Sequence, residues 1–150
     1  ARIDHVVTSG TFSLDGETHQ VDNNVWVVGD DAECVVIDAP HDVDAILDCF
    51  ADDGIFDITE GPDPWGERFQ GKAAIRTALE GLFKVLPDVQ FTDGVHWVAG
   101  DRGTSEWTCV ATTPRGRQFR VRGCDLFEFR DGLITRKDSY FKKIVRRDPS

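Results

Sequence analysis

The sequence lacks several patterns that would place it in a large class of proteins. No apolar run approaches the roughly 18 residues needed to cross a bilayer, and no basic-then-apolar leader is present, so no membrane partner and a cytoplasmic location are predicted. The four cysteines contain no Cys-x-x-Cys pair, and the four histidines are not spaced as metal ligands. We therefore expect no metal site, disulfide framework or cofactor, and interpret the cysteines as buried, reduced thiols.

Positive charge is also scarce. The chain has 17 basic and 27 acidic residues, a formal charge of −10, which repels a phosphate backbone and argues against a nucleic-acid partner. We interpret the few clustered basic residues near the end of the chain as a solvated tail: Lys142, Lys143, Arg146 and Arg147. At 150 residues the chain is long enough for one ordinary domain with a single core.

Apolar spacing predicts an α+β organisation. Residues 1–40 indicate short strands, at 11–14, 24–28 and 34–37, and the last two are expected to form a β-hairpin. From Asp42 the spacing becomes helical, and Asp42 can cap a short helix. A strand is expected at 55–58, and a loop at 61–69 because two prolines and two glycines fall there. The clearest helix covers 72–85 and stops before Pro87.

The remainder of the chain predicts four long strands in an antiparallel meander, near 89–98, 105–113, 118–130 and 133–145. In the third, Asp125, Phe127 and Phe129 share one face because side chains alternate along a strand. A carboxyl group among aromatic rings is costly to ionise, which makes Asp125 the leading candidate for a catalytic acid or hydrogen-bond donor. The alternative is that Asp125 bonds within the core or pairs with a neighbour such as Lys137.

The sequence from about residue 41 to the end resembles the nuclear transport factor 2-like superfamily, in its SnoaL-like and ketosteroid isomerase-like branch. Three segments carry the likeness: His41 to Gly54, Gly71 to Arg76, and Gly123 to Ile134 followed by Tyr140-Phe141. The resemblance implies a conical, bent antiparallel sheet with helices on its concave side, often dimeric. By this resemblance, Asp125 stands at the position where ketosteroid isomerases hold a protonated aspartic acid of the oxyanion hole.

Two departures from the family argue against steroid isomerisation. The general-base position falls on Ile58, with Asp57 expected on the opposite face, and the tyrosine partner belongs to a long first helix that this chain lacks. A base role for Asp57 or Glu60 is conceivable, although acids beside a proline-rich loop are more often solvated. In limonene epoxide hydrolase-like members a catalytic acid precedes the last Tyr-Phe, where this chain has Ser139.

The family match and strand alternation together predict a mostly apolar pocket for a small apolar molecule. Its expected lining residues are Ile58, Trp65, Thr108, Val110, Thr112, Phe127, Ser139 and Phe141. The opposite face is predicted to carry an apolar homodimer surface made of Trp107, Cys109, Cys124 and Leu126. His96 is interpreted as a structural histidine rather than a general base.

Residues 1–40 have a second resemblance, to the opening strands of metallo-β-lactamase-fold hydrolases. It rests on Arg2 to His5, Asp22 to Asp30 and Val35 to Ala39, without the histidine cluster that holds zinc in those enzymes. We therefore expect residues 1–40 to be a β-rich segment, not an independent domain, joined to a SnoaL-like domain at 41–150 as in a chimera. Two functions stay open: an isomerase or cyclase using Asp125, and a non-catalytic ligand-binding or dimerisation module.

Overall fold

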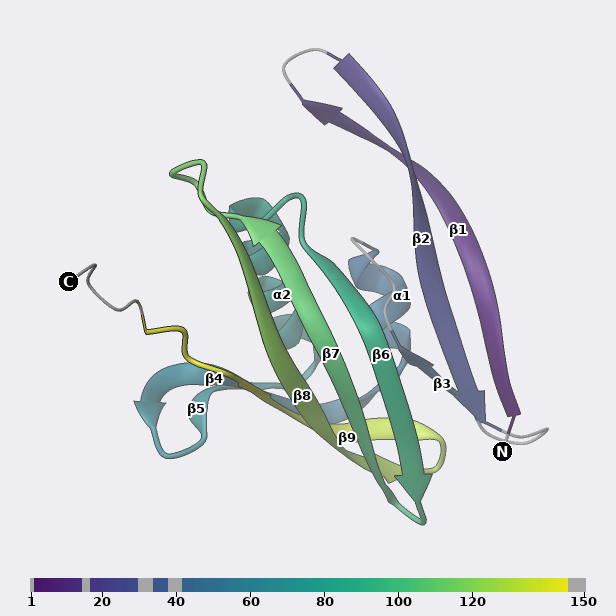
Figure 1. The fold of residues 1–150 in the computed structure, drawn as a ribbon. Helices are drawn as coiled ribbons and strands as arrows, with labels where there is room; N and C mark the ends of the chain where they lie inside the picture. Colours follow the sequence, from purple (N-terminus) through teal and green to yellow (C-terminus); the bar gives the residue numbers. More distant parts are fainter. Residues whose placement is uncertain (1, 15–16, 30–33, 38–41, 146–150) are drawn as a thin grey trace.

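The computed structural model describes the backbone of residues 2–14, 17–29, 34–37 and 42–145, and the side chains of residues 42–145. The first part of the chain is a three-stranded antiparallel sheet of β1 (Arg2–Leu14), β2 (Glu17–Gly29) and β3 (Cys34–Ile37). The pairing of β2 with β3 confirms the predicted hairpin. The pairing of β1 with β2, from Arg2 opposite Gly29 to Leu14 opposite Glu17, makes both strands longer than the sequence predicted. These strands pair with none of the described strands that follow (Figure 1).

The second part contains two helices and a six-stranded sheet (Figure 1). Helix α1 (Val43–Asp48) is capped at its N-terminus by Asp42. The Asp42 Oδ1 accepts a 3.0 Å hydrogen bond from the Ala45 amide, so the predicted cap is confirmed. Helix α2 (Lys72–Val85) has the predicted bounds. The strand order is β5-β4-β9-β8-β7-β6.

The strands of this sheet are β4 (Phe50–Asp63), β5 (Gly66–Gln70), β6 (Gln90–Ala99), β7 (Arg102–Thr112), β8 (Gln118–Arg130) and β9 (Leu133–Phe141). The predicted meander β6 to β9 is confirmed in order and direction. However, β4 and β9 run parallel, so the sheet is mixed rather than wholly antiparallel.

The prediction of a loop at 61–69 is wrong. Strand β4 continues to Asp63 and returns as β5 after the turn at Pro64 and Trp65, with Asp63 opposite Gly66. Gly66 has φ +82°, and a Cβ there would lie 1.7 Å from the Ile58 carbonyl oxygen, so a tight hairpin is possible with glycine at this position. The prolines sit at the end of the hairpin, where no ladder hydrogen bond is needed from them.

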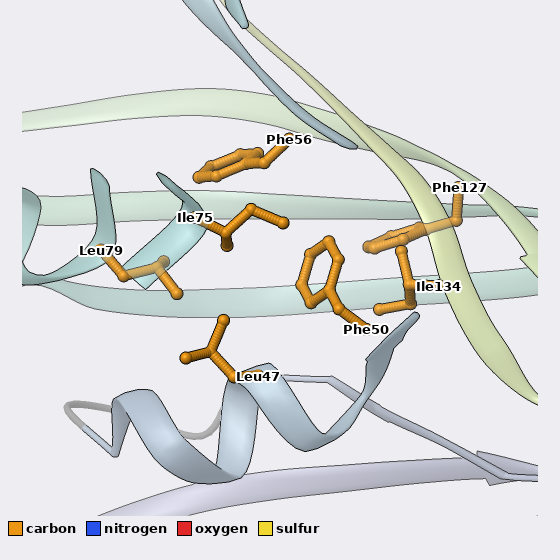
Figure 2. Packing of buried hydrophobic residues seen from close by; sticks show 7 residues of the cluster. All are labelled: Leu47, Phe50, Phe56, Ile75, Leu79, Phe127 and Ile134. Carbon is orange, nitrogen blue, oxygen red and sulfur yellow. The ribbon is translucent and has the colours of Figure 1, made fainter. Parts of the chain in front are cut away.

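The helices cover one face of the sheet, which we call the inner face. Its core joins residues from both helices to β4, β8 and β9: Leu47, Phe50, Phe56, Ile75, Leu79, Phe127 and Ile134 (Figure 2). Ile75, at 0 % exposed, lies at the centre of this contact between α2 and the sheet. We call the opposite face of the sheet the outer face.

A second apolar cluster continues the inner face toward β6 and β7. It consists of Val89, Trp107, Cys109 and Ala111, with Phe83 and Leu86 from the end of α2 packed against it. Burial raises the pKa of the Cys109 thiol to about 11, with a smaller contribution from the negative charge of Asp88. Cys109 is therefore a buried, protonated thiol, as the sequence predicted.

Candidate functional site

Asp125 lies on the inner face of β8 and is 7 % exposed. Its neighbour along that face, Phe127, packs in the core beside α2, which fixes the direction of the alternation. The predicted inward orientation of Asp125 is therefore confirmed. Antiparallel pairing places Ser139 of β9 directly opposite it on one side and Ser105 of β7 on the other.

Three donors surround the Asp125 carboxyl group. Trp107 Nε1 donates to Oδ2 over 2.9 Å, and Ser139 Oγ donates to Oδ1 over 2.6 Å. The Lys137 ammonium lies 2.8 Å from Oδ1 and also donates to Ser139 Oγ over 2.8 Å. A carboxyl group that receives three hydrogen bonds, one from a cation, is arranged as an ionised acceptor rather than as a donor. The alternative pairing with Lys137 that the sequence left open is the one observed.

Aromatic rings form the rest of this environment. Lys137 Nζ is 4.7 Å from the centroid of Phe56 and 5.9 Å from that of Phe127, both favourable cation–π distances. Phe127 stacks on Phe129 with centroids 5.8 Å apart. The side chain of Lys137 is 23 % exposed, against 10 % for that of Asp125. Lys137 thus lies between the buried carboxylate and solvent.

A second polar pair continues the row across the sheet. His96 of β6 is opposite Ser105, and its Nδ1 lies 2.9 Å from Ser105 Oγ. Burial lowers the pKa of His96, and the negative charge of Asp125 opposes this shift only in part, so the imidazole is neutral at pH 7. His96 Nε2 is buried and has no hydrogen-bond partner among the described residues. Ser139, Asp125, Ser105 and His96 thus form one row of inward polar side chains.

Trp107 occupies the inner face above Gly123. Phe91 meets its indole edge-on, with ring centroids 5.2 Å apart. A Cβ on Gly123 would lie 2.2 Å from Trp107 Cη2 and 2.5 Å from the Tyr140 carbonyl oxygen. The absence of a side chain at residue 123 therefore allows Trp107 to reach Asp125.

We expect Gly123→Ala to lower the free energy of unfolding by about 2 kcal/mol, because the added methyl displaces the indole and crowds a backbone carbonyl. Urea unfolding, with the near-ultraviolet circular dichroism of the tryptophans as a second signal, measures this. The matched control is Gly81→Ala on α2, where an added Cβ meets nothing within 4 Å and helix propensity should stabilise. Equal stability of the two variants would contradict the packing described.

The structure corrects several predicted positions. Thr108, Val110 and Thr112 are opposite Arg122, Arg120 and Gln118, so they belong to the outer face and do not line the site. Trp107 and Cys109 are opposite Gly123 and Val121, on the inner face, and cannot form the predicted dimer surface. The physical reason is register: a shift of one residue on β7 exchanges its two faces. Cys124 and Leu126 do lie on the outer face.

Other predicted residues lie on the inner face but at different distances from the carboxylate. Phe127 and Ser139 adjoin Asp125, and Phe141 is opposite Gly123 and 42 % exposed. Ile58 packs against the core instead. Glu60 is exposed on β4, and nothing in the structure brings it to the site.

Asp57 lies on the outer face, as expected from its offset from Ile58, and is 0 % exposed. Arg68 and Arg136 both bond its carboxylate, Nε to Oδ1 over 2.7 Å and Nε to Oδ2 over 3.0 Å. Arg68 also stacks 5.0 Å from the Trp65 ring, so Trp65 covers this ion cluster rather than the Asp125 site. Asp57 is therefore a structural ion-pair partner and not a base in the inner site.

The inner face around Asp125 is closely filled. Two shallow hollows in the described part of the chain, of about 280 and 160 Å³, lie elsewhere, and Asp125 lines neither of them. Within residues 42–145, no three His, Cys, Asp or Glu side chains gather as metal ligands do. No helix of the described part of the chain is long and apolar enough to span a membrane.

Sequence reasoning missed the roles of Trp107, Ser105 and His96 at this site. One signal in the sequence could have paired two of them, His96 and Ser105. The turn at 100–101 pairs Ala99 with Arg102, and counting back along both strands places His96 opposite Ser105. The pairing of Ser105 with Asp125 depends on the register of β7 with β8, which the structure supplies.

Comparison with solved structures supports this fold. A candidate polyketide cyclase from Xanthomonas campestris pv. campestris is 28 % identical, with a TM-score of 0.60 over 67 % of this chain and 78 % of that one. A candidate polyketide cyclase from Pseudomonas putida KT2440 is 24 % identical, with a TM-score of 0.60 over 67 % and 80 %. A candidate isomerase from Bacillus subtilis is 23 % identical, with a TM-score of 0.57 over 67 % and 75 %.

A search of curated proteins found no significant match. The likeness of residues 1–40 to metallo-β-lactamase-fold hydrolases, and the idea of a chimera, stay predictions. The model of the SnoaL-like domain matches residues 38–137, which contain both helices, Asp125 and Lys137. The mixed six-stranded sheet with two helices on its inner face is the nuclear transport factor 2-like α+β cone, and this chain belongs to the SnoaL-like domain family.

Proposed function

We propose that the inner face of this domain binds a small apolar carbonyl compound, and that Asp125 transfers a proton in an isomerisation or cyclisation of it. The observation that carries this proposal is the Asp125 carboxylate, buried on the concave side of the cone and held by three donors. A buried carboxylate fixed in this way is a defined proton acceptor, which is the group that enolisation requires.

The neighbouring donors suit the rest of the reaction. Asp125 takes a proton from the carbon next to the substrate carbonyl, and negative charge develops on the carbonyl oxygen. The ammonium of Lys137 and the hydroxyl of Ser139, which now point at Asp125, are close enough to stabilise that oxygen. Protonated Asp125 then acts as the acid. In an isomerisation it returns the proton to another carbon of the enolate system. In a cyclisation the enolate carbon bonds to a second carbonyl carbon of the same molecule, the C–O π bond of that carbonyl breaks, and Asp125 protonates the alkoxide that forms.

The comparisons support this choice of reaction class. The relative from Xanthomonas campestris pv. campestris, 28 % identical, is named as a candidate polyketide cyclase. The fold alone hosts many activities, so the site residues carry the argument for this chain.

The alternative is a module that binds a ligand without catalysis. The filling of the inner face by Trp107 and Lys137 favours it, because a substrate must displace one of these side chains to reach the carboxylate. Lys137, the more exposed of the two, is the group we expect to move.

Deuterium exchange distinguishes these functions. With 2-tetralone in heavy water, we expect the protein to accelerate exchange of the protons next to the carbonyl, followed by NMR. Asp125→Asn should abolish the acceleration, because the amide keeps the shape of the carboxylate but cannot accept the proton. The matched control is Glu60→Gln, which removes an exposed carboxylate of β4 and should leave the rate unchanged. Binding of 2-tetralone without exchange would favour the non-catalytic module.

We also propose that the domain forms a homodimer through its outer face. Trp97, Thr104 and Leu126 lie in one row across β6, β7 and β8, and Trp97 and Leu126 are 48 % and 45 % exposed. Val95, 54 % exposed, adjoins them on the same face. Apolar side chains gathered on a sheet face are typical of an interface.

Leu126→Asp is expected to convert the dimer to a monomer, because it places a charge in the centre of that surface. Size-exclusion chromatography with light scattering gives the mass directly. Val85→Asp is the control, since Val85 is also about half exposed, at 53 %, but lies on α2. A monomeric parent protein at micromolar concentration would refute the interface.

A further inference from the structure

A hollow of about 280 Å³ lies at the beginning of β8, away from the Asp125 site. Its lining residues are Arg117, Gln118, Phe119, Arg120 and Ile144. After β9 the chain continues beside β8, because the Lys142 amide donates to the Arg122 carbonyl over 2.8 Å. This continuation brings Ile144 against the first residues of β8. Residues at the start of β8 and Ile144, beyond β9, therefore line one hollow, and two of these residues are arginines.

The charge of this region is opposite to that of the whole chain. Although the chain has 27 acidic residues, none occurs between Glu106 and Asp125, and none between Asp138 and Asp148. The hydrogen bond from Lys142 to Arg122 makes these two acid-free stretches neighbours. Their described basic residues are Arg115, Arg117, Arg120, Arg122, Lys142 and Lys143. Three carboxylates border these stretches: Asp88, whose Oδ1 accepts from the Thr112 amide over 2.9 Å, Asp93 and Glu106. The six basic residues outnumber them, so the hollow lies in a local excess of positive charge on an acidic protein.

The cations differ in whether a carboxylate neutralises them. Arg120 pairs with Asp93 over 2.9 Å, and Arg122 pairs with Glu106 over 3.0 Å. Within residues 42–145, Arg117 has no carboxylate within 4.0 Å, although it lines the hollow. Its backbone is held by the turn, because its amide donates to Thr113 Oγ1 over 3.2 Å and its carbonyl accepts from the Thr113 amide over 2.9 Å. Among the described residues, the Arg117 side chain thus has no carboxylate partner, while its backbone is fixed.

We propose that this hollow is a binding site for an organic phosphate with an apolar body. A guanidinium group offers paired donors that match phosphate oxygens, and Arg117 has none of them engaged by a carboxylate. Ile144, 61 % exposed, supplies apolar surface for the rest of the ligand, together with the accessible part of Phe119, which packs against the second apolar cluster. Six residues separate Phe119 from Asp125 along β8, about 20 Å at the rise of a strand. The site is therefore distinct from the proposed catalytic one.

The test uses 1-naphthyl phosphate, which combines a dianion with an apolar ring system, and measures binding by isothermal titration calorimetry and by NMR shifts of the backbone amides. We expect binding that weakens as salt is added, with the largest shifts at residues 117–120. Arg117→Ala should weaken binding about tenfold or more, since a charge-assisted hydrogen bond is lost. The turn bonds of Arg117 use its backbone, so this variant keeps its fold.

Three controls make the result specific. Lys84→Ala removes an exposed cation from the end of α2 and should leave the affinity unchanged. Asp125→Asn should also leave it unchanged, which separates this site from the proposed catalytic one. Neutral 1-naphthol should bind at least tenfold more weakly than its phosphate. Equal weakening by Lys84→Ala and Arg117→Ala, or shifts centred on residues near Asp125, would overturn the proposal.

Discussion

Replacing Asp125 by alanine is expected to lower the free energy of unfolding by about 3 kcal/mol. The substitution leaves the Trp107 indole N–H, 2.9 Å from Oδ2, without its acceptor in a buried position. It also leaves the Lys137 ammonium, 2.8 Å from Oδ1, beside two aromatic rings without its counter-charge. Lys137 can turn partly to solvent, which keeps the loss below that of a fully enclosed ion pair.

The comparison with Asp125→Asn separates packing from charge. The amide oxygen of asparagine can still accept from Trp107 or Ser139, so we expect this variant to lose about 1–2 kcal/mol. Urea unfolding followed by far-ultraviolet circular dichroism measures both variants under the same conditions. If alanine and asparagine destabilise equally, the hydrogen bonds to the carboxyl group contribute nothing measurable, and the described site is wrong.

The elements that the sequence predicted best are those whose local signals agree. The bounds of α2 follow from its apolar spacing together with Pro87, and the start of α1 follows from the side chain of Asp42. The inward orientation of the Asp125 side chain follows from Phe127 and Phe129, because two aromatic residues on one face of a strand indicate that this face is buried. These signals need no knowledge of any distant residue.

The faces of β7 could not be predicted in the same way. Its inner and outer positions both include buried side chains, since Ser105, Trp107 and Cys109 are buried on one face and Thr108 on the other. Alternation alone therefore does not indicate which face of β7 is the inner one. The register of β7 with β8 determines it. Trp107 and Gly123 fit opposite each other sterically, because the large indole occupies the space that a side chain at residue 123 would fill.

The hydrogen-bond donors around Asp125 could not be predicted from local sequence signals either. The alternation of Asp125, Phe127 and Phe129 along the strand indicated a carboxyl group among aromatic rings, and those rings are present. The hydrogen bonds of the carboxyl group, however, come from donors on β7 and β9. Lys137 is two residues from Ser139 and therefore on the same face, so both reach one carboxylate. Neither residue alone indicates a site, and their convergence depends on the pairing of β8 with β9.

Asp57→Ala is expected to cause the largest loss of stability in this domain, about 4 kcal/mol. Asp57 is 0 % exposed and joins Arg68 to Arg136, so removing it leaves two partly buried guanidinium groups on the outer face without their shared anion. Tyr140 and Arg136 both bond Asp138 nearby, at 3.0 and 2.9 Å, and that carboxylate cannot compensate both arginines. Chemical unfolding at pH 7 measures the loss.

The control is Asp53→Ala on the same strand. Asp53 also bonds an arginine, Arg130, over 2.7 Å, but its side chain is 64 % exposed. Because water and salt screen an exposed pair, we expect a small effect there. A similar loss of stability from both substitutions would mean that burial does not strengthen the ion pairs of Asp57.

The stability that Asp57 contributes should also depend on pH in a defined direction. Burial alone would raise the pKa of Asp57, but the hydrogen bonds from Arg68 and Arg136 outweigh it and lower the pKa in the folded state. A carboxyl group with a lowered folded pKa stabilises the fold fully above its unfolded value, about 3.9, and loses this contribution as the pH falls through the folded value. The difference in stability between the parent protein and Asp57→Ala should therefore be constant from pH 7 to about pH 5 and shrink below about pH 4. A difference that grew on acidification would show that Asp57 is held in its neutral form, and that the two arginines have other partners.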